Sequence, residues 1–201
     1  NMIDQARRNA AAAGVELEFQ VAGFGQLVSH TQVSFDAVLC LGNSLPHVLT
    51  ETGLLATLAD WHVALRPGGL LLVQNRNMDA VLARRDRWMP VQQRATEGHE
   101  WLFVRFYDFD EQGLTFNVVT LERSKGEPWR QRVDATRLSP WRHEQLVEVF
   151  TQAGFGDIVY LEFGQQAAHS ADVETRAHRR PVEHDRFHVD IRSALSQSTG
   201  R

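Results

Sequence analysis

The chain has 201 residues, of which 43% are hydrophobic and 23% charged, with a formal net charge of −4 at pH 7. This length is enough for one domain with a substantial core. The charge leaves no basic excess for a phosphate backbone, so we expect no nucleic-acid partner. The longest apolar runs, such as residues 70–73, are too short to cross a membrane, and a single cysteine excludes an intramolecular disulfide. We therefore expect a cytoplasmic protein with no membrane partner.

Helices and strands alternate in the first part of the sequence. Apolar residues at helical spacing predict helices, whereas short alternating or continuous apolar runs predict strands. The nearly all-apolar run at residues 35–41 is typical of a strand covered on both faces in a parallel sheet. The predicted order is a helix at 2–13, strands at 15–21 and 35–41, a helix at 50–65, a strand at 70–74 and a helix at 77–87. This order predicts an α/β fold with a Rossmann-like, doubly wound, mostly parallel sheet.

The pattern changes after Pro90, where three strands follow one another. They are predicted at 101–109, 114–123 and 129–137, separated by turns that contain Gly113 and Gly126. We expect an antiparallel β meander inserted at about residues 99–138. Trp101 and Tyr107 share one face of its first strand, either as a wall beside a substrate or as packing core. A helix at 142–153 and a strand at 157–163 complete the regular part.

The last part of the chain is less regular. Residues 164–201 are rich in His, Arg, Ser and Ala and contain few large apolar side chains. Only Phe187, Val189 and Ile191 alternate convincingly, which predicts a final strand at 186–191; otherwise the segment is an irregular extension. We therefore predict an α/β domain over residues 1–163, followed by a C-terminal extension over 164–201.

Three stretches resemble class I S-adenosylmethionine-dependent methyltransferases over residues 1 to about 163. They read "NMIDQARRNAAAAGVELEFQVAGFGQL", "FDAVLCLGNSLPHV" and "LRPGGLLLVQNRNMD". The second and third are most similar to the glycine/sarcosine N-methyltransferase type, whose members carry a Cys-Leu-Gly-Asn-Ser turn and an Arg-Asn pair after the next strand. The resemblance implies S-adenosyl-L-methionine as the cofactor and a small molecule as the substrate.

Two predicted loops are candidates for binding the cofactor. In an open α/β sheet, ligands bind beyond the carboxyl ends of the strands, where these loops begin. The resemblance places the adenine near the first loop and the methionine part near the second. The residues concerned are Ala22, Gly23 and Phe24 in the first loop and Leu41, Gly42, Asn43 and Ser44 in the second. Alternatively, the first loop is a plain glycine turn, and Asn43 or Ser44 caps the next helix.

Three residues are candidates for catalysis. Arg76 directly follows a strand, where its guanidinium could hold a carboxylate through two parallel hydrogen bonds. In the family that it resembles, the arginine at this motif position binds the carboxylate of the amino acid; the alternative is an ion pair with Asp79 or Asp108. Asn43 would help to position the substrate. His47 could accept a proton or be a structural histidine.

The function that the resemblance implies is methyl transfer to a small molecule, such as the amine of an amino-acid-like substrate. The family's glycine-rich loop and the acidic residue that binds the ribose have no counterpart here and would precede Asn1. We therefore expect the methyltransferase fold to be N-terminally incomplete. The alternative function is a catalytically silent, methyltransferase-like domain that binds a ligand or a protein partner.

Other kinds of site fit the sequence less well. A dinucleotide fingerprint fails because the Gly23-Phe24-Gly25 stretch lacks the third glycine. A DNA-methylating motif is not matched at residues 43–46, and a Cys40–His47 nucleophile pair ranks low because a cysteine within a buried strand is usually a core residue. His184 and His188 have the i, i+4 spacing of metal ligands on a helix, but a solvated extension is favoured and we expect no metal.

Overall fold

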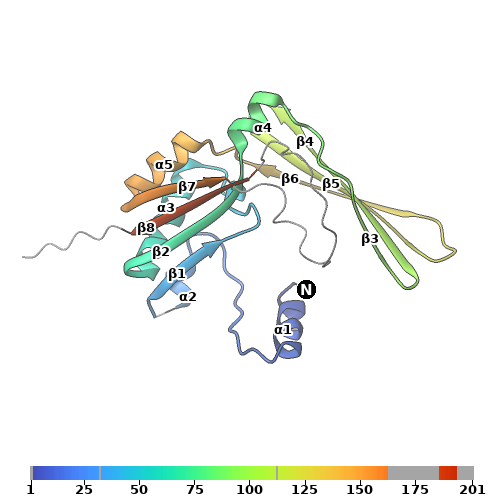
Figure 1. Cartoon of the computed structure of the whole chain (residues 1–201), viewed down its shortest axis with the longest axis horizontal. Coiled ribbons are helices and arrows are strands. Elements are labelled where there is room, and N and C mark those ends of the chain that lie inside the picture. The colour runs from blue at the N-terminus through green and yellow to red at the C-terminus, as the bar shows by residue number, and fades with distance from the viewer. Residues whose placement is uncertain (1, 32, 112, 163–185, 194–201) are drawn as a thin grey trace, which may run out of the picture.

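A computed structural model describes residues 2–31, 33–111, 113–162 and 186–193. Two four-stranded sheets lie side by side and meet near the helix α4 (Figure 1). Sheet A has the strand order β1-β2-β8-β7, and sheet B has the order β3-β4-β5-β6. The α/β sheet and the inserted antiparallel sheet predicted from the sequence are both confirmed.

The helices and strands follow the predicted order closely. The helices are α1 (Met2–Ala12), α2 (Leu27–His30), the 3-10 helix η1 (Leu45–His47), α3 (Glu51–Ala64), α4 (Met78–Arg84) and α5 (His143–Gln152). The strands are β1 (Phe35–Cys40), β2 (Leu65–Arg76), β3 (Gln92–Thr96), β4 (His99–Asp110), β5 (Gly113–Ser124), β6 (Arg130–Leu138), β7 (Phe155–Glu162) and β8 (Arg186–Ser193).

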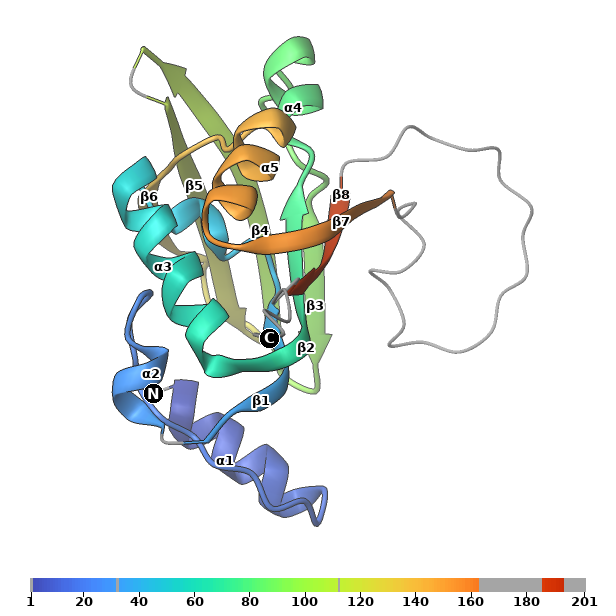
Figure 2. The same cartoon turned by 90° about the vertical axis from the view of Figure 1, so that its left-hand side faces the viewer.

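Sheet A contains the main core. β1 and β2 are parallel, and β8 runs antiparallel between β2 and β7, so three of the four strands share one direction. The helices α3 and α5 lie on the same face of this sheet (Figure 2). Leu58 of α3, Leu71 of β2 and Phe150 of α5 are fully buried between them. Burying each such side chain stabilises the fold by roughly 1.5 to 3 kcal/mol.

The opposite face of β1 is not covered as predicted. Leu39 has 58% of its surface exposed, whereas Cys40, its neighbour on the strand, is buried. Successive side chains of a strand point to opposite faces, and the described helices α3 and α5 pack only on the Cys40 side. The prediction of a strand covered on both faces is therefore wrong for β1 in the described structure.

The predicted strand at residues 15–21 is also wrong. This segment follows α1 as an irregular chain, with Val15, Leu17 and Val21 exposed at 51%, 62% and 78%. Alternating apolar residues form a stable strand only when a neighbouring strand supplies the backbone partners. No strand in the described ranges pairs with residues 15–21, so this segment does not join either sheet.

Sheet B is an antiparallel meander with one more strand than predicted. β4, β5 and β6 correspond to the predicted strands, and their antiparallel pairing is confirmed. β3, which pairs with β4, was missed because its sequence, QQRAT, is polar and every residue of it is exposed. Sheet B has its own small core, in which Tyr107, Leu114 and Leu138 pack against Met78 and Val81 of α4.

The end of the chain contributes one strand to sheet A. β8 corresponds to the predicted final strand, which is confirmed. His188 lies in β8, and His184 lies outside the described residues. None of the described helices is long and apolar enough to cross a membrane. The division into residues 1–163 and 164–201 remains a prediction.

Candidate functional site

The turn that follows β1 is bonded to the end of the neighbouring strand β2. Gly42 and Asn43 both have positive φ angles, of 74° and 63°, which glycine and asparagine adopt more readily than other residues. The backbone N–H of Gly42 donates to Oε1 of Gln74 at 3.0 Å, and that of Asn43 donates to the Gln74 carbonyl at 3.1 Å. The backbone N–H of Arg76 donates to Oδ1 of Asn43 at 2.9 Å. Two predicted site residues, Asn43 and Arg76, are therefore held together.

The capping alternative for this turn is not what the structure shows. Ser44 occupies the N-cap position of η1 without a capping hydrogen bond, and its hydroxyl donates to the Leu41 carbonyl at 2.7 Å. Thr50, and neither Asn43 nor Ser44, caps α3 by accepting from the backbone N–H of Gly53. The polar side chains of the turn therefore fix its own shape and its attachment to β2.

The Arg76 side chain reaches sheet B. Its guanidinium carbon lies 5.5 Å from the centre of the Tyr107 ring, and Nη1 donates to the Tyr107 hydroxyl at 3.4 Å. Tyr107 is buried, with 1% of its surface exposed. Of the two predicted ion-pair partners of Arg76, Asp79 accepts from the backbone N–H of His143, and Asp108 pairs with Arg87. Arg76 therefore lies where the two sheets meet, on a rigid aromatic support.

Two further polar residues flank this junction. His47 is exposed at the end of η1, and its backbone N–H donates to the Ser44 carbonyl at 3.1 Å. Asn75 is buried, with 4% exposed, and neither atom of its amide has a hydrogen-bond partner among the described residues. Buried amides are normally paired, so Asn75 marks a polar spot inside the end of β2.

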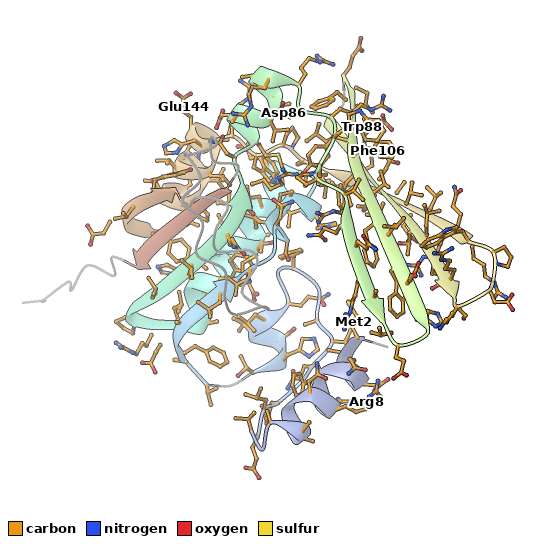
Figure 3. All side chains as sticks on the ribbon, turned by 45° about the vertical axis from the view of Figure 1, so that its right-hand side comes forward. Met2, Arg8, Asp86, Trp88, Phe106 and Glu144 are labelled. Carbon is orange, nitrogen blue, oxygen red and sulfur yellow. The ribbon has the colours of Figure 1, made fainter. Side chains whose placement is uncertain are left out.

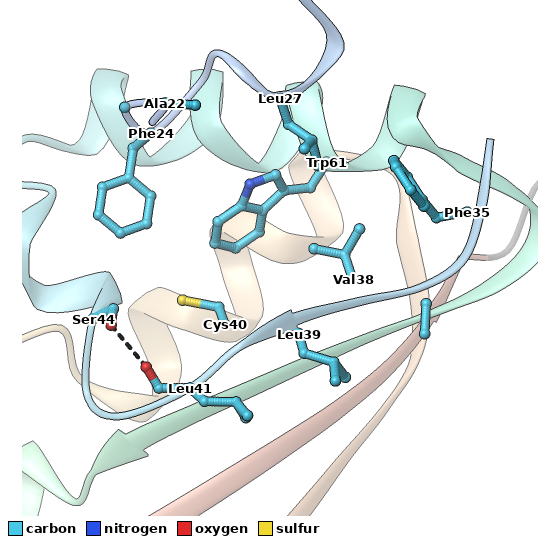
Figure 4. Close-up of a pocket in the computed structure, with 12 residues that line it drawn as sticks. Ala22, Phe24, Leu27, Phe35, Val38, Leu39, Cys40, Leu41, Ser44 and Trp61 are labelled. Atoms are coloured by element: carbon cyan, nitrogen blue, oxygen red, sulfur yellow. Dashed lines mark hydrogen bonds between the residues drawn. The ribbon is translucent and has the colours of Figure 1, made fainter. Parts of the chain in front are cut away.

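A cavity of about 620 Å³ opens along β1, beside the turn. Five predicted cofactor residues line it, namely Ala22, Gly23, Phe24, Leu41 and Ser44 (Figure 4). The remaining lining residues are Leu27, Phe35, Ala37, Val38, Leu39, Cys40 and Trp61. Gly42, Asn43, His47 and Arg76 are not among the lining residues, so the structure divides the predicted site between the cavity and the neighbouring junction.

The walls of this cavity are mostly apolar and aromatic. The rings of Phe24 and Trp61 lie 6.0 Å apart, with Trp61 on α3 and Phe24 on the preceding loop. Asp60, next to Trp61, fixes that loop because its carboxylate accepts from the backbone N–H groups of Leu27 and Val28 at 2.7 and 3.0 Å. Volumes of 300 to 1,000 Å³ with such linings are typical of small-molecule sites. The cavity therefore has the size and the chemistry to receive a flat aromatic group.

Cys40 faces this cavity as a neutral thiol. Burial raises its pKa from 9.0 to about 11, outweighing a backbone hydrogen bond at Leu45 that lowers it. A cysteine nucleophile needs a lowered pKa, so the environment of Cys40 does not favour a Cys40–His47 pair. Among the described residues, no group of three or more His, Cys, Asp or Glu side chains is placed to bind a metal ion.

The sequence missed two of the residues that shape the site. Trp61 was not predicted as a site residue, because a tryptophan at helical spacing among leucines normally indicates core packing. Gln74 was predicted at the end of a strand, with no role in holding the turn, yet both its side chain and its carbonyl accept hydrogen bonds from the turn. Tyr107 was predicted as either a substrate wall or packing core, and in the structure it packs in the core beneath α4.

Known proteins support the sequence resemblance. Residues 1–69 match the family described as "Methyltransferase domain". The chain is 27% identical over 179 residues to the glycine/sarcosine N-methyltransferase of Aphanothece halophytica, covering 88% of this chain and 63% of that protein. It is 44% identical over 48 residues to the enzyme of the same name from Halorhodospira halochloris, covering 24% and 18% of the two chains. The chain thus spans less than two thirds of the length of these curated relatives.

Solved structures with low sequence identity share the fold. A S-adenosylmethionine-dependent methyltransferase from Clostridium acetobutylicum ATCC 824 has a TM-score of 0.70 at 10% identity, covering 95% of this chain and 70% of its own. Streptomyces venezuelae DesVI has a TM-score of 0.65 at 18% identity, covering 94% and 69%.

The chain therefore has the fold of S-adenosylmethionine-dependent methyltransferases of known structure, and its residues 1–69 match a methyltransferase-domain family, in agreement with the sequence resemblance. Within that class, the curated proteins to which it is similar are glycine/sarcosine N-methyltransferases.

Proposed function

We propose that this protein transfers a methyl group from S-adenosyl-L-methionine to the amine of a small, carboxylate-bearing, amino-acid-like molecule. The observation that carries this proposal is the pairing of Arg76 with Asn43 at the ends of two adjacent parallel strands, beside an aromatic cavity. The names of the similar curated proteins, which are glycine/sarcosine N-methyltransferases, support the same chemistry. We expect a cytoplasmic protein.

The cavity along β1 is the proposed donor site. S-adenosylmethionine, when bound, supplies an electrophilic methyl group on a sulfonium. Phe24 and Trp61 offer apolar walls for the purine, and the small residues Ala22 and Gly23 leave space for it. The turn of residues 41–44 would then contact the methionine part. Gly42 has open space where a Cβ would lie, so its backbone can approach a ligand closely.

Arg76 is the proposed carboxylate-binding residue. A guanidinium can hold a carboxylate through two parallel, charge-assisted hydrogen bonds, which fix both distance and orientation. Tyr107 supports one face and one nitrogen of this guanidinium. Asn43 uses its Oδ1 to bind the backbone of Arg76, and its Nδ2 group carries two further donors for a substrate. The two side chains would therefore orient the amine toward the donor cavity.

The proposed reaction depends chiefly on alignment. The lone pair of the neutral amine forms an N–C bond to the methyl carbon while the C–S bond breaks and its electron pair stays on sulfur. The extra proton then leaves the methylated nitrogen for His47 or for solvent. His47 is the candidate base because it is exposed at the end of η1, four residues after Asn43. Holding the two reactants in line can supply most of the rate enhancement.

Methyl transfer to a panel of amines with and without a carboxylate tests the proposal. Arg76→Ala should lower kcat/KM for carboxylate-bearing amines by about 100-fold, since it removes two charge-assisted bonds. Arg66→Ala is the control, because Arg66 is an exposed arginine of the same strand that pairs with Asp36. Undiminished turnover by Arg76→Ala would remove Arg76 from the mechanism. Calorimetry without detectable S-adenosylmethionine binding would favour the silent, ligand-binding alternative.

A further inference from the structure

The short helix α4 directly follows Arg76 and packs against sheet B. Arg76 ends β2 of sheet A, and α4 begins two residues later, at Met78. Met78 and Val81 of α4 are buried in the core of sheet B, each with 1% of its surface exposed. The position of α4 would therefore follow that of sheet B, unless a second contact fixes it to sheet A.

Asp79 makes such a contact from the first turn of α4. Its Oδ2 accepts from the backbone N–H of His143, the first residue of α5, at 2.9 Å. The first turn of α5, marked by Glu144, lies beside α4 (Figure 3). A hydrogen bond to a carboxylate is about twice as strong as one between neutral groups, and a helix N-terminus attracts negative charge. Asp79 therefore bonds one helix to the other.

The helix α5 is a rigid partner for this bond because it belongs to the core of sheet A. Leu146, Val149 and Phe150 of α5 are buried in the cluster beneath that sheet. The same cluster contains Cys40 and Trp61, which line the donor cavity. A bond from α4 to α5 is thus a bond to the elements that support the donor cavity.

Tyr160 of β7 lies at the same place. Its ring centre is 3.6 Å from that of the His143 ring. Burial and, to a smaller extent, the negative charge of Asp79 raise the pKa of the Tyr160 phenol above its ordinary value. The phenol is therefore neutral near neutral pH, and it places no second negative charge near the Asp79 carboxylate. Asp79, His143 and Tyr160 join α4, α5 and β7 at one point.

The segment from Arg76 to Asp79 has little freedom between its two ends. The backbone N–H of Arg76 donates to Asn43 of the turn after β1. Asn77 caps α4, because its Oδ1 accepts from the backbone N–H of Ala80 at 2.8 Å. Arg76 and Asp79 are only three positions apart, so a displacement of Asp79 would be transmitted to Arg76.

We propose that Asp79 is a positioning residue of the acceptor site: by bonding α4 to α5, it holds the Arg76 guanidinium at a fixed place relative to the donor cavity. This inference rests on the proposed function, in which Arg76 binds the carboxylate of the acceptor. Asp79 does not line the donor cavity, so it should affect the acceptor and not the donor.

Methyl-transfer kinetics of Asp79→Ala and Asp79→Asn test this proposal. Asp79→Ala should raise KM for a carboxylate-bearing amine about tenfold, because it removes both the charge and the hydrogen-bond acceptor. Asp79→Asn should raise it only about threefold, because its Oδ1 can still accept from the His143 N–H. The affinity for S-adenosylhomocysteine, measured by calorimetry, should not change in either variant.

Asp86→Ala is the matched control. Asp86 lies just beyond α4 (Figure 3) and pairs with Arg84 of that helix at 2.6 Å, so its removal leaves the bond to α5 intact. Asp86→Ala should therefore leave KM for the acceptor unchanged. Asp79→Asn keeps the shape of the side chain, so it tests the proposal even if Asp79→Ala does not fold.

Hydrogen exchange gives a readout that does not depend on turnover. In Asp79→Ala, the backbone amides of α4 and of His143 should exchange at least about tenfold faster than in the wild type, because the bond that holds them is lost. The amides of α3 should keep their rates, and Asp86→Ala should change neither set. Unchanged exchange of α4 and His143 in Asp79→Ala would overturn the proposal.

The kinetic outcomes separate this proposal from the proposed function. If the wild type methylates carboxylate-bearing amines and both Asp79 variants keep its KM, the positioning role is wrong and the proposed function stands. A wild type without turnover of any such amine would overturn the proposed function and this inference with it. An equal loss of acceptor and donor affinity in Asp79→Asn would also overturn it, because Asp79 would then support the fold as a whole.

Discussion

The two sheets of this molecule differ in how they are supported. Sheet A lies against the helices α3 and α5, and the buried cluster around it includes four large aromatic side chains, those of Trp61, Trp141, Phe150 and Phe155. Among the described residues, the cluster beneath sheet B is smaller, and α4 is the one helix that contributes to it. We infer that the two sheets have different roles. Sheet A is the rigid support of the donor cavity, whereas sheet B is packed mainly at its end near α4.

The contact between Arg76 and Tyr107 links these two parts. Arg76 ends β2 of sheet A, and Tyr107 belongs to β4 of sheet B. On the proposed function, changes in sheet B should therefore affect the acceptor more than the donor. Variants that weaken either core, or the contact between Arg76 and Tyr107, test whether the two sheets have separate roles.

The largest effect is expected from the core of sheet A. Leu58 of α3 is fully buried, so Leu58→Ala should lower the free energy of unfolding by about 3 to 5 kcal/mol through lost burial and the cavity left behind. Urea denaturation would measure this loss. Leu49→Ala, at a leucine that is 52% exposed, is the control and should cost less than about 1 kcal/mol. A similar small loss for both variants would contradict the rigid-support interpretation.

A smaller stability effect is expected from the core of sheet B. Leu114 is also fully buried, but its cluster is smaller and can relax more easily, so Leu114→Ala should cost about 2 to 3 kcal/mol. The same variant should raise KM for the acceptor, because Tyr107 packs in this cluster and supports Arg76. Its affinity for S-adenosylhomocysteine, measured by calorimetry, should not change. An equal loss of donor-product affinity would show that the two sheets do not act separately.

Most of sheet A and the meander could be predicted from the sequence, because the side chains that are buried there follow the local spacing of apolar residues and the strands pair as that spacing predicts. The helix at residues 50–65 was recognised from its leucine stripe, and the structure buries Leu54 and Leu58 of that stripe. The Gly-Asn-Ser turn and Arg76 were found from motif resemblance, and the structure brings Asn43 and Arg76 into hydrogen-bond contact. Their roles in binding a substrate remain proposals.

The errors arose where structure depends on distant partners. Apolar residues alternate in residues 15–21 as they do in a strand. Such a segment joins a sheet only if a neighbouring strand pairs with its backbone, and the local sequence does not predict that pairing. The reverse holds for β3, whose polar sequence gives no strand signal although β4 supplies its hydrogen bonds. The contact between Gln74 and the turn joins residues that are 32 positions apart, so the local sequence did not predict it either.

A pH-dependent effect is expected inside the donor cavity. Burial raises the pKa of the folded Cys40 thiol to about 11 from 9.0, so the folded state binds its proton more tightly than the unfolded state does. The resulting stabilisation is fully present below pH 9 and is lost as the pH rises from 9 to 11, by about 2 kcal/mol. Unfolding measured at several pH values in wild type and Cys40→Ala isolates this contribution. Parallel pH profiles for the two proteins would refute it.

The smallest effect is expected at the link between the sheets. Tyr107→Phe keeps the ring beneath Arg76 and removes only the hydroxyl that accepts from Nη1 at 3.4 Å. A hydrogen bond of this kind contributes about 0.5 to 1.5 kcal/mol, so KM for a carboxylate-bearing amine should rise about threefold to tenfold. Tyr107→Leu also removes the aromatic face and should raise KM further.

The control for this pair is Phe106→Leu, because Phe106 is the neighbouring residue of β4 and points to the opposite face of sheet B from Tyr107. Phe106→Leu should leave KM for the carboxylate-bearing amine unchanged. None of the three substitutions should change the affinity for S-adenosylhomocysteine. A Tyr107→Leu enzyme with wild-type KM would mean that Arg76 needs no support from sheet B. The acceptor site would then belong to sheet A alone, and sheet B would take no part in binding the substrate.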